Sequence, residues 1–457
     1  MDQTSKASQS RGILSKLTLT VVAAGSLLSA LDLFIVNIAF PSIRDSFSDA
    51  SNQSLSWVLS AYSIVFAALL VPSGRMGDRF GRRNAFRFGL IVFAIASAAC
   101  AFAPNVGMLI AARTLKGAGA ALMIPSSIGL LLGAYPPSKH KQMLAIWAAI
   151  ASVGAALGPV LGGLLVHLDW RYIFLINLPI AIPAIFLCCY LQETERGESG
   201  VPDILGSVLF ALGTACVVAA ISYFHEWGAL SHKLWVITVA GVAMLSVFIY
   251  RCNTARNPAL DLRVFRIPAF SLATIGMLTF YTGFSMSILA GSLYLTQVWA
   301  WDPARAGIAY AIGPALAGTT SILSGRGKIA PRTLTLIGSL VFVAASLWWL
   351  TFLGDTSNFL IGFLPGFALS GIAAGMAQAG FLAAGTAVLS PGEYSAGSGI
   401  LNTSRQIGGA LGIALLVALT GTAQHSQDFL VAFWVISVTS LAAAATSLSI
   451  KKSRSAR

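Results

Sequence analysis

Charged side chains are scarce in this sequence. Asp, Glu, Lys and Arg make up only 10% of the 457 residues, whereas apolar residues make up 56%. A soluble globular protein carries roughly 25% charged residues, and a chain of this length cannot keep an aqueous surface solvated with far fewer. We therefore expect lipid to be its solvent, because lipid accepts apolar outer surfaces when backbone polar groups pair inside helices.

The motifs of enzymes and ATP-driven pumps are missing as well. No Gly-x4-Gly-Lys-Ser/Thr phosphate loop occurs, and Gly325-Arg-Gly-Lys328 is too short to be one. The pair His225-Glu226 has alanine at position 229 instead of a second histidine, and the five cysteines lack zinc-ligand spacing. No nucleophile–base–orienter set appears. We expect no enzymatic activity, no cofactor and no metal site.

What the chain has instead is a series of long apolar stretches. A membrane-spanning helix needs about 20 mainly apolar residues, and fourteen stretches qualify. The N-terminal segment is basic and continues into about 25 apolar residues, too long for the apolar core of a signal peptide. We expect a first span and no cleaved signal. The predicted spans are 17–40, 56–74, 85–103, 106–133, 143–166, 171–190, 204–223, 234–250, 269–297, 304–323, 333–352, 358–388, 398–421 and 428–449.

The basic residues lie in short runs between these stretches. With both termini in the cytoplasm, the inner segments hold about 22 of the 29 basic residues and the outer loops about 4. This bias favours an even number of spans and predicts cytoplasmic termini. It also explains the net charge of +13 without a nucleic-acid partner. One inner loop, Glu193–Asp203, is acidic and departs from the trend.

The segment between the second and third spans reads Gly-Arg-Met-Gly-Asp-Arg-Phe-Gly-Arg-Arg over 74–83. Its glycines predict a tight turn, and the carboxylate of Asp78 can pair with an arginine or a helix N-terminus. A plain basic loop with turn glycines is the alternative. The candidate gate residues are Gly74, Arg75, Gly77, Asp78, Arg79, Gly81, Arg82 and Arg83.

This segment resembles the signature loop of the major facilitator superfamily. The segments 31–41, 113–119, 154–163 and 402–409 resemble motifs in the first, fourth, fifth and thirteenth spans of its fourteen-span drug:proton antiporters. Two departures are Lys116, where that family usually has glutamine, and the degraded second copy of the loop motif at Gly325–Arg332. The resemblance covers nearly the whole chain.

The resemblance implies an all-α integral membrane protein with the major facilitator fold, in which two six-helix pseudo-symmetric halves surround a central cavity. Two extra helices would be inserted between the halves. The expected division is a cytoplasmic tail at 1–16, the first half at 17–190, the inserted pair at 204–250, the second half at 269–449 and a basic cytoplasmic tail at 450–457.

Two opposite charges fall inside predicted spans. Asp32 lies roughly 13 Å below the outer surface and Arg113 about 12 Å, at 1.5 Å per helical residue. An unpaired charge near mid-membrane costs at least a few kcal/mol, so we expect both to face a shared polar cavity. A static ion pair is the alternative. The resemblance favours a role of Asp32 and Arg113 in proton coupling.

Lys116 follows Arg113 by one helical turn, on nearly the same face. The two cations would repel unless water or an anion lies between them. We hypothesise a positive patch that favours anionic or neutral substrates, with a lysine that snorkels away from the cavity as the alternative. Apart from Asp428 at the first position of the last span, the second-half spans carry no acidic residue, which puts cationic substrates in doubt.

Small residues follow a helical spacing in the fifth span. Gly154, Gly158 and Gly162 form one smooth face that permits close backbone approach, and Pro159 permits a bend. With Gly163 they make up the antiporter-type motif. The face is expected to flex between inward- and outward-open states. Simple tight packing is the alternative.

Further polar residues inside or at the ends of spans are candidates for the cavity wall, although each could equally form a helix–helix hydrogen bond. With Lys116 they are Asn37, Tyr62, Gln297, Asn402, Arg405 and Gln406.

Together these features predict proton-coupled efflux of small organic or amphipathic compounds by alternating access, with the 74–83 segment latching the inner gate. The alternatives are a dedicated exporter of an endogenous metabolite and, from another class, a membrane sensor on a transporter scaffold. The expected partners are a small-molecule substrate, protons and the lipid bilayer, and not nucleic acid. We expect a monomer in the inner (cytoplasmic) membrane of the cell.

Overall fold

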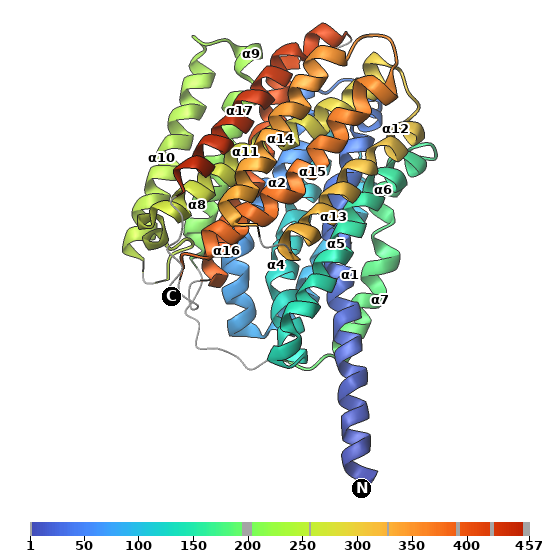
Figure 1. Cartoon of the computed structure of the whole chain (residues 1–457), viewed down its shortest axis with the longest axis vertical. Helices are drawn as coiled ribbons and strands as arrows, with labels where there is room; N and C mark the ends of the chain where they lie inside the picture. The colour runs from blue at the N-terminus through green and yellow to red at the C-terminus, as the bar shows by residue number, and fades with distance from the viewer. Residues whose placement is uncertain are drawn as a thin grey trace.

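The computed structural model describes residues 2–193, 203–255, 257–326, 329–389, 394–420 and 425–450. Every regular element in these ranges is helical (Figure 1). The α-helices are α1 (Asp2–Ser46), α2 (Asn52–Phe80), α3 (Arg82–Ala101), α4 (Val106–Ala134), α5 (Pro137–Val166), α6 (Tyr172–Leu175), α7 (Leu178–Leu187), α8 (Ile204–Ser222), α9 (Phe224–Trp227), α10 (His232–Thr254), α11 (Pro268–Leu293), α12 (Pro303–Tyr310), α13 (Ile312–Arg326), α14 (Pro331–Phe352), α15 (Leu364–Thr386), α16 (Tyr394–Thr420) and α17 (Leu430–Ser449). Short 3₁₀ turns are η1 (Cys188–Tyr190), η2 (Leu262–Arg266) and η6 (Ser426–Phe429), and π-helical turns are η3 (Tyr294–Val298) and η4 (Phe359–Phe363).

Fourteen helical segments among the described residues are long and apolar enough to cross a membrane, which confirms the predicted number. Five spans are composite: α6, α7 and η1 form the sixth, α11 continues into η3, α12 into α13, η4 into α15, and η6 into α17. Side-chain caps mark where several spans begin. The side chains of Ser51, Asn105 and Asp302 accept hydrogen bonds from backbone N–H groups of the first helical turn.

The outward surface is apolar, as a lipid-facing surface must be. Helix α10 presents Trp235, Val239 and Val242 with 59%, 62% and 56% of their surface exposed. Water would penalise such a run of large apolar side chains, whereas lipid does not.

The spans pack into two bundles with matching pairings. In the first bundle α1 packs on α5, α2 on α4 and α3 on α4 and α7. In the second, α11 packs on α16, α13 on α15 and α14 on α15 and α17. Counted as spans, the first set pairs 1 with 5, 2 with 4, and 3 with 4 and 6. The second set pairs 9 with 13, 10 with 12, and 11 with 12 and 14, so each span number is raised by eight. The contacts between the bundles are symmetric too. The second span (α2) contacts the thirteenth (α16), and the fifth span (α5) contacts the tenth (α12 and α13). These pairings confirm two pseudo-symmetric six-helix halves.

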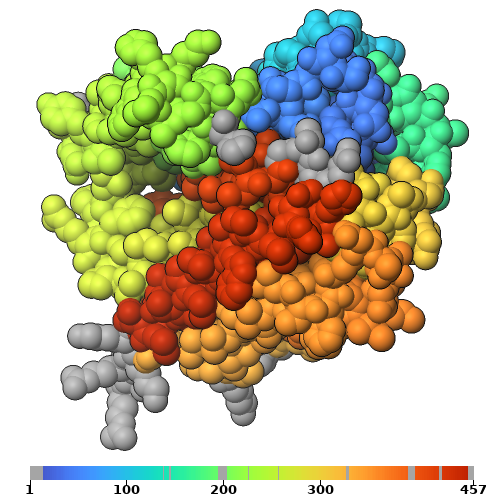
Figure 2. Space-filling model, turned by 90° about the horizontal axis from the view of Figure 1, so that it is seen from above, coloured from blue at the N-terminus to red at the C-terminus, as the bar shows by residue number. Residues whose placement is uncertain are grey.

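The inserted pair, α8 and α10, packs beside the junction of the bundles. The two helices contact each other, and α8 also contacts α2 and α16. Figure 2 shows the pair in yellow-green at one edge of the molecule. Arg251 of α10 donates to Asp203, the N-cap of α8, at 2.7 Å. The pair therefore rests on both bundles as one unit.

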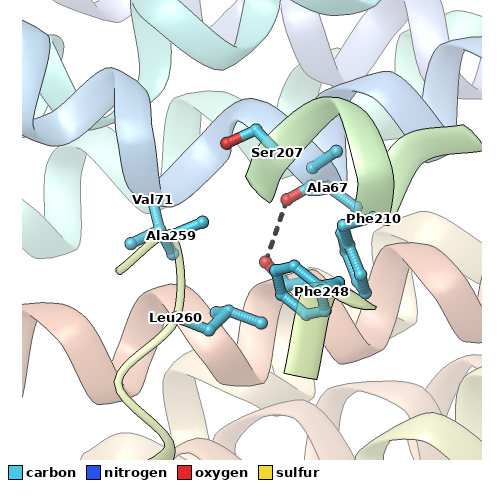
Figure 3. A pocket seen from close by; sticks show the side chains of 9 residues that line it. Ala67, Val71, Ser207, Phe210, Phe248, Ala259 and Leu260 are labelled. Atoms are coloured by element: carbon cyan, nitrogen blue, oxygen red, sulfur yellow. Dashed lines mark hydrogen bonds between the residues drawn. The ribbon is translucent and has the colours of Figure 1, made fainter. Parts of the chain in front are cut away.

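A small crevice of about 190 Å³ lies where the inserted pair meets α2 (Figure 3). It is lined mainly by apolar side chains, among them Val71, Phe210 and Phe248. In its wall, the Thr403 hydroxyl of α16 donates to the Ala67 carbonyl of α2 at 3.1 Å, the dashed line in Figure 3. This bond ties the two bundles together directly.

The structure corrects the prediction of a loop at 74–83. Helix α2 continues to Phe80 and α3 begins at Arg82, so Gly81 alone makes the turn. Gly81 has a φ of +97°, and a Cβ there would lie 2.6 Å from the Glu193 carboxyl carbon. Glycine is needed at this one position for both reasons. The end of the molecule that carries this turn is called the Gly81 end below.

Some predicted segments fall partly outside the described residues. Helix α1 begins at Asp2 and so runs through most of the segment 1–16 that was expected to be a tail. Residues 451–457 of the predicted basic tail, residues 194–202 of the acidic loop, and Gly327 and Lys328 of the degraded motif are outside the described ranges.

Candidate functional site

A large cavity of about 4200 Å³, measured with the solvent at its open end, lies between the two bundles. Its walls come from α1, α2, α4 and α5 on one side and from α11, α13, α15 and α16 on the other. At the Gly81 end its wall includes Arg75, Asp78 and Arg82. The polar or charged wall residues nearer mid-membrane include Asn37, Tyr62, Arg113, Tyr281, Gln378, Asn402, Arg405 and Gln406.

Toward the opposite end the space is filled. Tyr294, Trp299 and Phe363 belong to one buried aromatic cluster there. Below it, α5 and α12 cross closely: the backbone of Pro303 lies against Gly163, and the Pro159 carbonyl lies against Gly307. The cavity therefore opens at the Gly81 end and is closed at the other.

The deepest charges form a cluster of three. Asp32 of α1 accepts from Arg113 through one carboxylate oxygen and from Lys116 through the other, both at 2.5 Å. None of the three side chains is more than 1% exposed. Arg113 also donates to the Val58 carbonyl of α2 at 2.8 Å, and its guanidinium lies 4.5 Å from the Tyr62 ring centre. With two cations and one carboxylate, the ionised cluster carries a net charge of +1.

The geometry corrects two predictions about this cluster. Arg113 reaches the cavity wall, but Asp32 does not, because Arg113 itself occupies the carboxylate. Lys116 lies off the wall too, with its ammonium over the rings of Phe93 and Phe174 at 4.6 and 5.1 Å. The anion between the two cations is Asp32. Lys116 therefore neither forms a positive patch on the cavity nor snorkels away.

Of the other wall candidates, Asn37, Tyr62, Asn402, Arg405 and Gln406 line the cavity, whereas Gln297 does not. Gln297 lies in the π-turn η3 at the closed end, beyond the cavity floor. Gln378 of α15 and Tyr281 of α11 were not predicted, yet both line the cavity, and the Tyr281 hydroxyl donates to Gln378 at 3.0 Å. Gln378 is the one amide side chain of α15, and this isolated polar residue in an apolar span could have marked it as a wall candidate.

The gate residues are spread over α2, the turn and the start of α3. Asp78 accepts from Arg82 at 2.9 and 2.8 Å, and Arg82 reaches the Gly129 carbonyl of α4 at 3.4 Å. Arg83 donates through its backbone to Glu193 at 2.9 Å and through its side chain to the Leu191 carbonyl at 3.1 Å. These bonds hold the ends of α2, α4 and the sixth span together within the first bundle.

The remaining gate positions differ from one another. A Cβ on Gly77 would lie 3.0 Å from the Ser126 hydroxyl of α4, whereas one on Gly74 would meet only Pro125 at 3.7 Å. Arg79 lies over the Phe80 ring at 5.7 Å and is not part of the cavity wall.

Arg75 connects the first bundle to the segment that follows the inserted pair. It donates to the Pro258 carbonyl at 2.8 Å. That segment ends at Asp261, which caps η2 and accepts from Arg263 at 2.8 Å. These bonds from Arg263 hold the pKa of the Asp261 carboxyl below its usual range. The segment between the inserted pair and α11 is thus held by Arg75 at Pro258 and by Arg263 at Asp261.

The glycine face of α5 lies against α1. A Cβ on Gly154 or Gly158 would lie 2.7 Å from the Leu27 carbonyl or 3.1 Å from the Leu31 carbonyl, and Gly162 packs on Ile35 in the same way. Gly163 points elsewhere, toward α12 of the second bundle. Helix α5 is therefore held between the helix that carries Asp32 and the opposite bundle.

A cavity between two pseudo-symmetric bundles, open at one end and lined with buried charge, defines a multi-pass membrane transporter. The chain belongs to the major facilitator superfamily, whose family model matches residues 22–273. This confirms the predicted family, and a transporter is what the family and the cavity indicate rather than an enzyme.

Two similar proteins are named for antibiotic resistance. The methylenomycin A resistance protein of Streptomyces coelicolor is 30% identical over 433 residues, covering 93% of this chain and 90% of that protein. The puromycin resistance protein pur8 of Streptomyces alboniger is 34% identical, covering 90% of this chain and 83% of that protein.

A solved structure shares the fold. A bacterial homologue of the human lysosomal transporter Spinster superposes with a TM-score of 0.64, covering 96% of this chain and 99% of that one, at 16% identity. At this identity the likeness concerns the fold alone.

Proposed function

We propose that this protein exports small organic compounds across the inner membrane of the cell in exchange for protons, by alternating access. The relatives named for resistance support export. The bias of Lys and Arg toward one side supports a cytoplasmic Gly81 end, which would make the described conformation inward-open. Substrate would then enter the cavity from the cytoplasm.

The observation that carries the proposal is the fully buried Asp32 between Arg113 and Lys116. Two cations favour the ionised carboxylate, which fits the state after a proton has left to the cytoplasm. Protonation from the outer side would require the carboxylate to leave at least one cation. Movement of α1 against α4 and α5 provides such a separation, because Asp32 is on α1 and both cations are on α4.

The gate residues and the α5 motif have proposed roles in this cycle. The Asp78–Arg82 pair would hold the ends of α2 and α4 as one body while the bundles rock. The glycine face at 154–162 would let α1 shift along α5, and Gly163 would form the contact with α12 that opens when the cavity turns outward. The protein would act as a monomer, because one chain forms the whole cavity.

The test is drug accumulation in efflux-deficient bacteria that express the full chain or its Asp32→Asn variant. Accumulation of puromycin, methylenomycin A and N-phenyl-1-naphthylamine is measured with and without a proton uncoupler. We expect wild type to lower the accumulation of at least one compound, and both the uncoupler and Asp32→Asn to abolish this effect.

The matched control is Asp45→Asn, which removes a carboxylate of the same helix that is 72% exposed. It should behave like wild type. Uncoupler-resistant efflux, or full efflux by Asp32→Asn at normal protein level, would contradict proton coupling through this cluster. Unchanged accumulation of every compound would contradict the export of such compounds.

A further inference from the structure

Arg405 is a second guanidinium that lines the cavity; it is half-buried and lies in the second bundle. It is on α16, and its side chain is part of the cavity wall. The guanidinium carbon lies 5.7 Å from the ring centre of Tyr281 on α11. Its Nε atom is buried and has no hydrogen-bond partner. The sequence predicts Arg405 in the cavity wall without indicating its chemical role.

No carboxylate of the described part of the second bundle can neutralise this charge from a cavity-lining helix. Helices α11, α13, α15 and α16 contain neither Asp nor Glu. Among the described wall residues the one carboxylate is Asp78, and it is bound by Arg82. Asp32 is held by its own two cations and is off the wall.

The contrast between the two bundles is informative. In the first bundle the buried Arg113 is matched by a carboxylate, as a charge at this depth requires. In the described part of the second bundle, a cation faces the cavity and no cavity-lining helix supplies a carboxylate for it. An intramembrane cation without a carboxylate partner that faces a cavity is the mark of a site for an anion supplied from outside the chain.

The surroundings of Arg405 suit an anion on an apolar body. A guanidinium binds carboxylate, sulfonate or phosphate oxygens through two parallel N–H groups. The Gln378 oxygen is engaged by Tyr281, so its amide nitrogen can offer N–H donors to the same anion. Phe284 and Ile288 line the neighbouring wall and can pack against an apolar or aromatic ring system.

We propose that Arg405 is the anion-binding residue of the substrate site, and that the preferred substrates are amphipathic organic anions whose carboxylate, sulfonate or phosphate group docks on Arg405 beside Gln378. This inference rests on the proposed export function for the identity of the cavity as the substrate site. It assigns the preference for anions, which the sequence had suggested through Lys116, to a different residue in the other bundle.

Two dyes with one scaffold test this inference directly. The probe 8-anilinonaphthalene-1-sulfonate is N-phenyl-1-naphthylamine with a sulfonate added. Their affinities are measured by fluorescence on purified full-length protein in nanodiscs of zwitterionic lipid, with empty nanodiscs subtracted. We expect wild type to bind the sulfonate at least about tenfold more tightly than the neutral dye, equal to about 1.4 kcal/mol.

Three variants separate the charge of Arg405 from its bulk and from general electrostatics. Arg405→Gln should weaken sulfonate binding about tenfold and change binding of the neutral dye less than about twofold. Arg405→Lys should retain part of the preference, because it keeps the charge and loses the paired donors. Arg305→Gln removes an exposed cation of the same bundle, stacked over Trp301 outside the cavity, and should change neither affinity.

Equal wild-type affinities for the two dyes would overturn the inference. So would an equal loss of both dyes in Arg405→Gln, or the same sulfonate loss in Arg305→Gln. The export function is judged separately by uncoupler-sensitive accumulation in cells. Proton-driven efflux with no preference for the sulfonate would sink the anion site alone, whereas the absence of any proton-driven efflux would sink the function.

Discussion

At the scale of single residues, the decisive feature is the unequal charge of the Asp32 cluster. One carboxylate is shared by two cations, so the net charge left in the cluster depends on which of the three side chains is removed. Removing the negative charge leaves two buried cations one turn apart, whereas removing Lys116 leaves a neutral pair. Breaking a buried ion pair by deleting one partner typically costs about 3–5 kcal/mol.

This imbalance predicts an order of stabilities. Asp32→Asn should lower the melting temperature of the purified protein more than Lys116→Met does. The double variant Asp32→Asn/Lys116→Met should recover part of the loss, because it removes one of the two unmatched cations. Thermal unfolding in detergent, followed by tryptophan fluorescence, gives the three values.

A double variant no more stable than Asp32→Asn alone would contradict the geometry in which Lys116 shares the carboxylate. Additive losses are the expected result for residues that do not interact. The control is Lys233→Met at the exposed start of α10, which should leave the melting temperature unchanged.

The sequence predicted the depth of Asp32 and Arg113 and their attraction, because helical rise fixes depth. It did not predict that Lys116 binds the same carboxylate. Depth and face place Lys116 beside Arg113, but the direction of a long flexible side chain depends on the rings of Phe93 and Phe174, which come from other spans. The same limit applies to Gln297, whose polarity suggested a cavity that does not extend to it.

At the scale of helices, α5 makes two different close contacts with its two glycine faces. Gly154, Gly158 and Gly162 lie on α1 inside the first bundle, and Gly163 lies on α12 of the second. The first contact lies within one bundle, where we propose that α1 slides along α5 without separating from it. The second belongs to the closed end of the cavity, which alternating access requires to open.

The two faces therefore predict different phenotypes. Gly158→Leu forces a side chain into the α1 backbone and should destabilise the protein by about 1–3 kcal/mol, the usual cost of overpacking. Gly163→Leu should leave the first bundle intact but loosen the closed end. We expect normal protein level with impaired efflux for Gly163→Leu, and a lower level for Gly158→Leu. Expression level, melting temperature and drug accumulation distinguish them.

Gly107→Leu is the control for replacing a helical glycine by leucine at a position without a close helix contact. A Cβ at Gly107 meets only the Asn105 side chain, at 3.4 Å, so there is room for a larger residue. If Gly163→Leu lost as much protein as Gly158→Leu, the distinction between a contact packed within one bundle and a contact that opens between the bundles would fail.

Helix existence was predictable throughout, because a run of about 20 apolar residues is a strong signal. The course of α2 was not. The glycines at 74 and 77 suggested a loop, but Gly77 serves a close approach to Ser126 within a continuous helix, and only Gly81 has the backbone angle of a turn. Sequence alone does not separate a glycine needed for packing from one needed for turning.

At the scale of the whole molecule, the two bundles share a plan and differ in charge. Their helix pairings match span for span. The first bundle carries Arg113 and Lys116 with Asp32 between them, whereas the described cavity-lining helices of the second bundle give Arg405 no carboxylate. We propose that the first bundle handles the proton and the second binds the substrate. Arg113 and Arg405 line the cavity from opposite walls, so the cavity would couple the two.

The pseudo-symmetry and the fourteen spans were largely predictable, since they follow from apolar length, basic runs and the resemblance to a family. The open end of the cavity was not, because a transporter sequence encodes both open states. The packing of α8 on α2 and α16 was not predictable either, since nothing in the apolar inserted pair marks its neighbours.

The most direct measurement is substrate-induced proton movement in liposomes that contain only this protein. A pH-sensitive dye trapped inside reports protons when a transported compound is added on one side in the absence of any other gradient. We predict a proton flux opposite to the substrate in wild type and in Asp45→Asn, and none in Asp32→Asn, which should still be folded in the membrane. Substrate movement without proton movement in wild type, or an undiminished proton flux in Asp32→Asn, would contradict it.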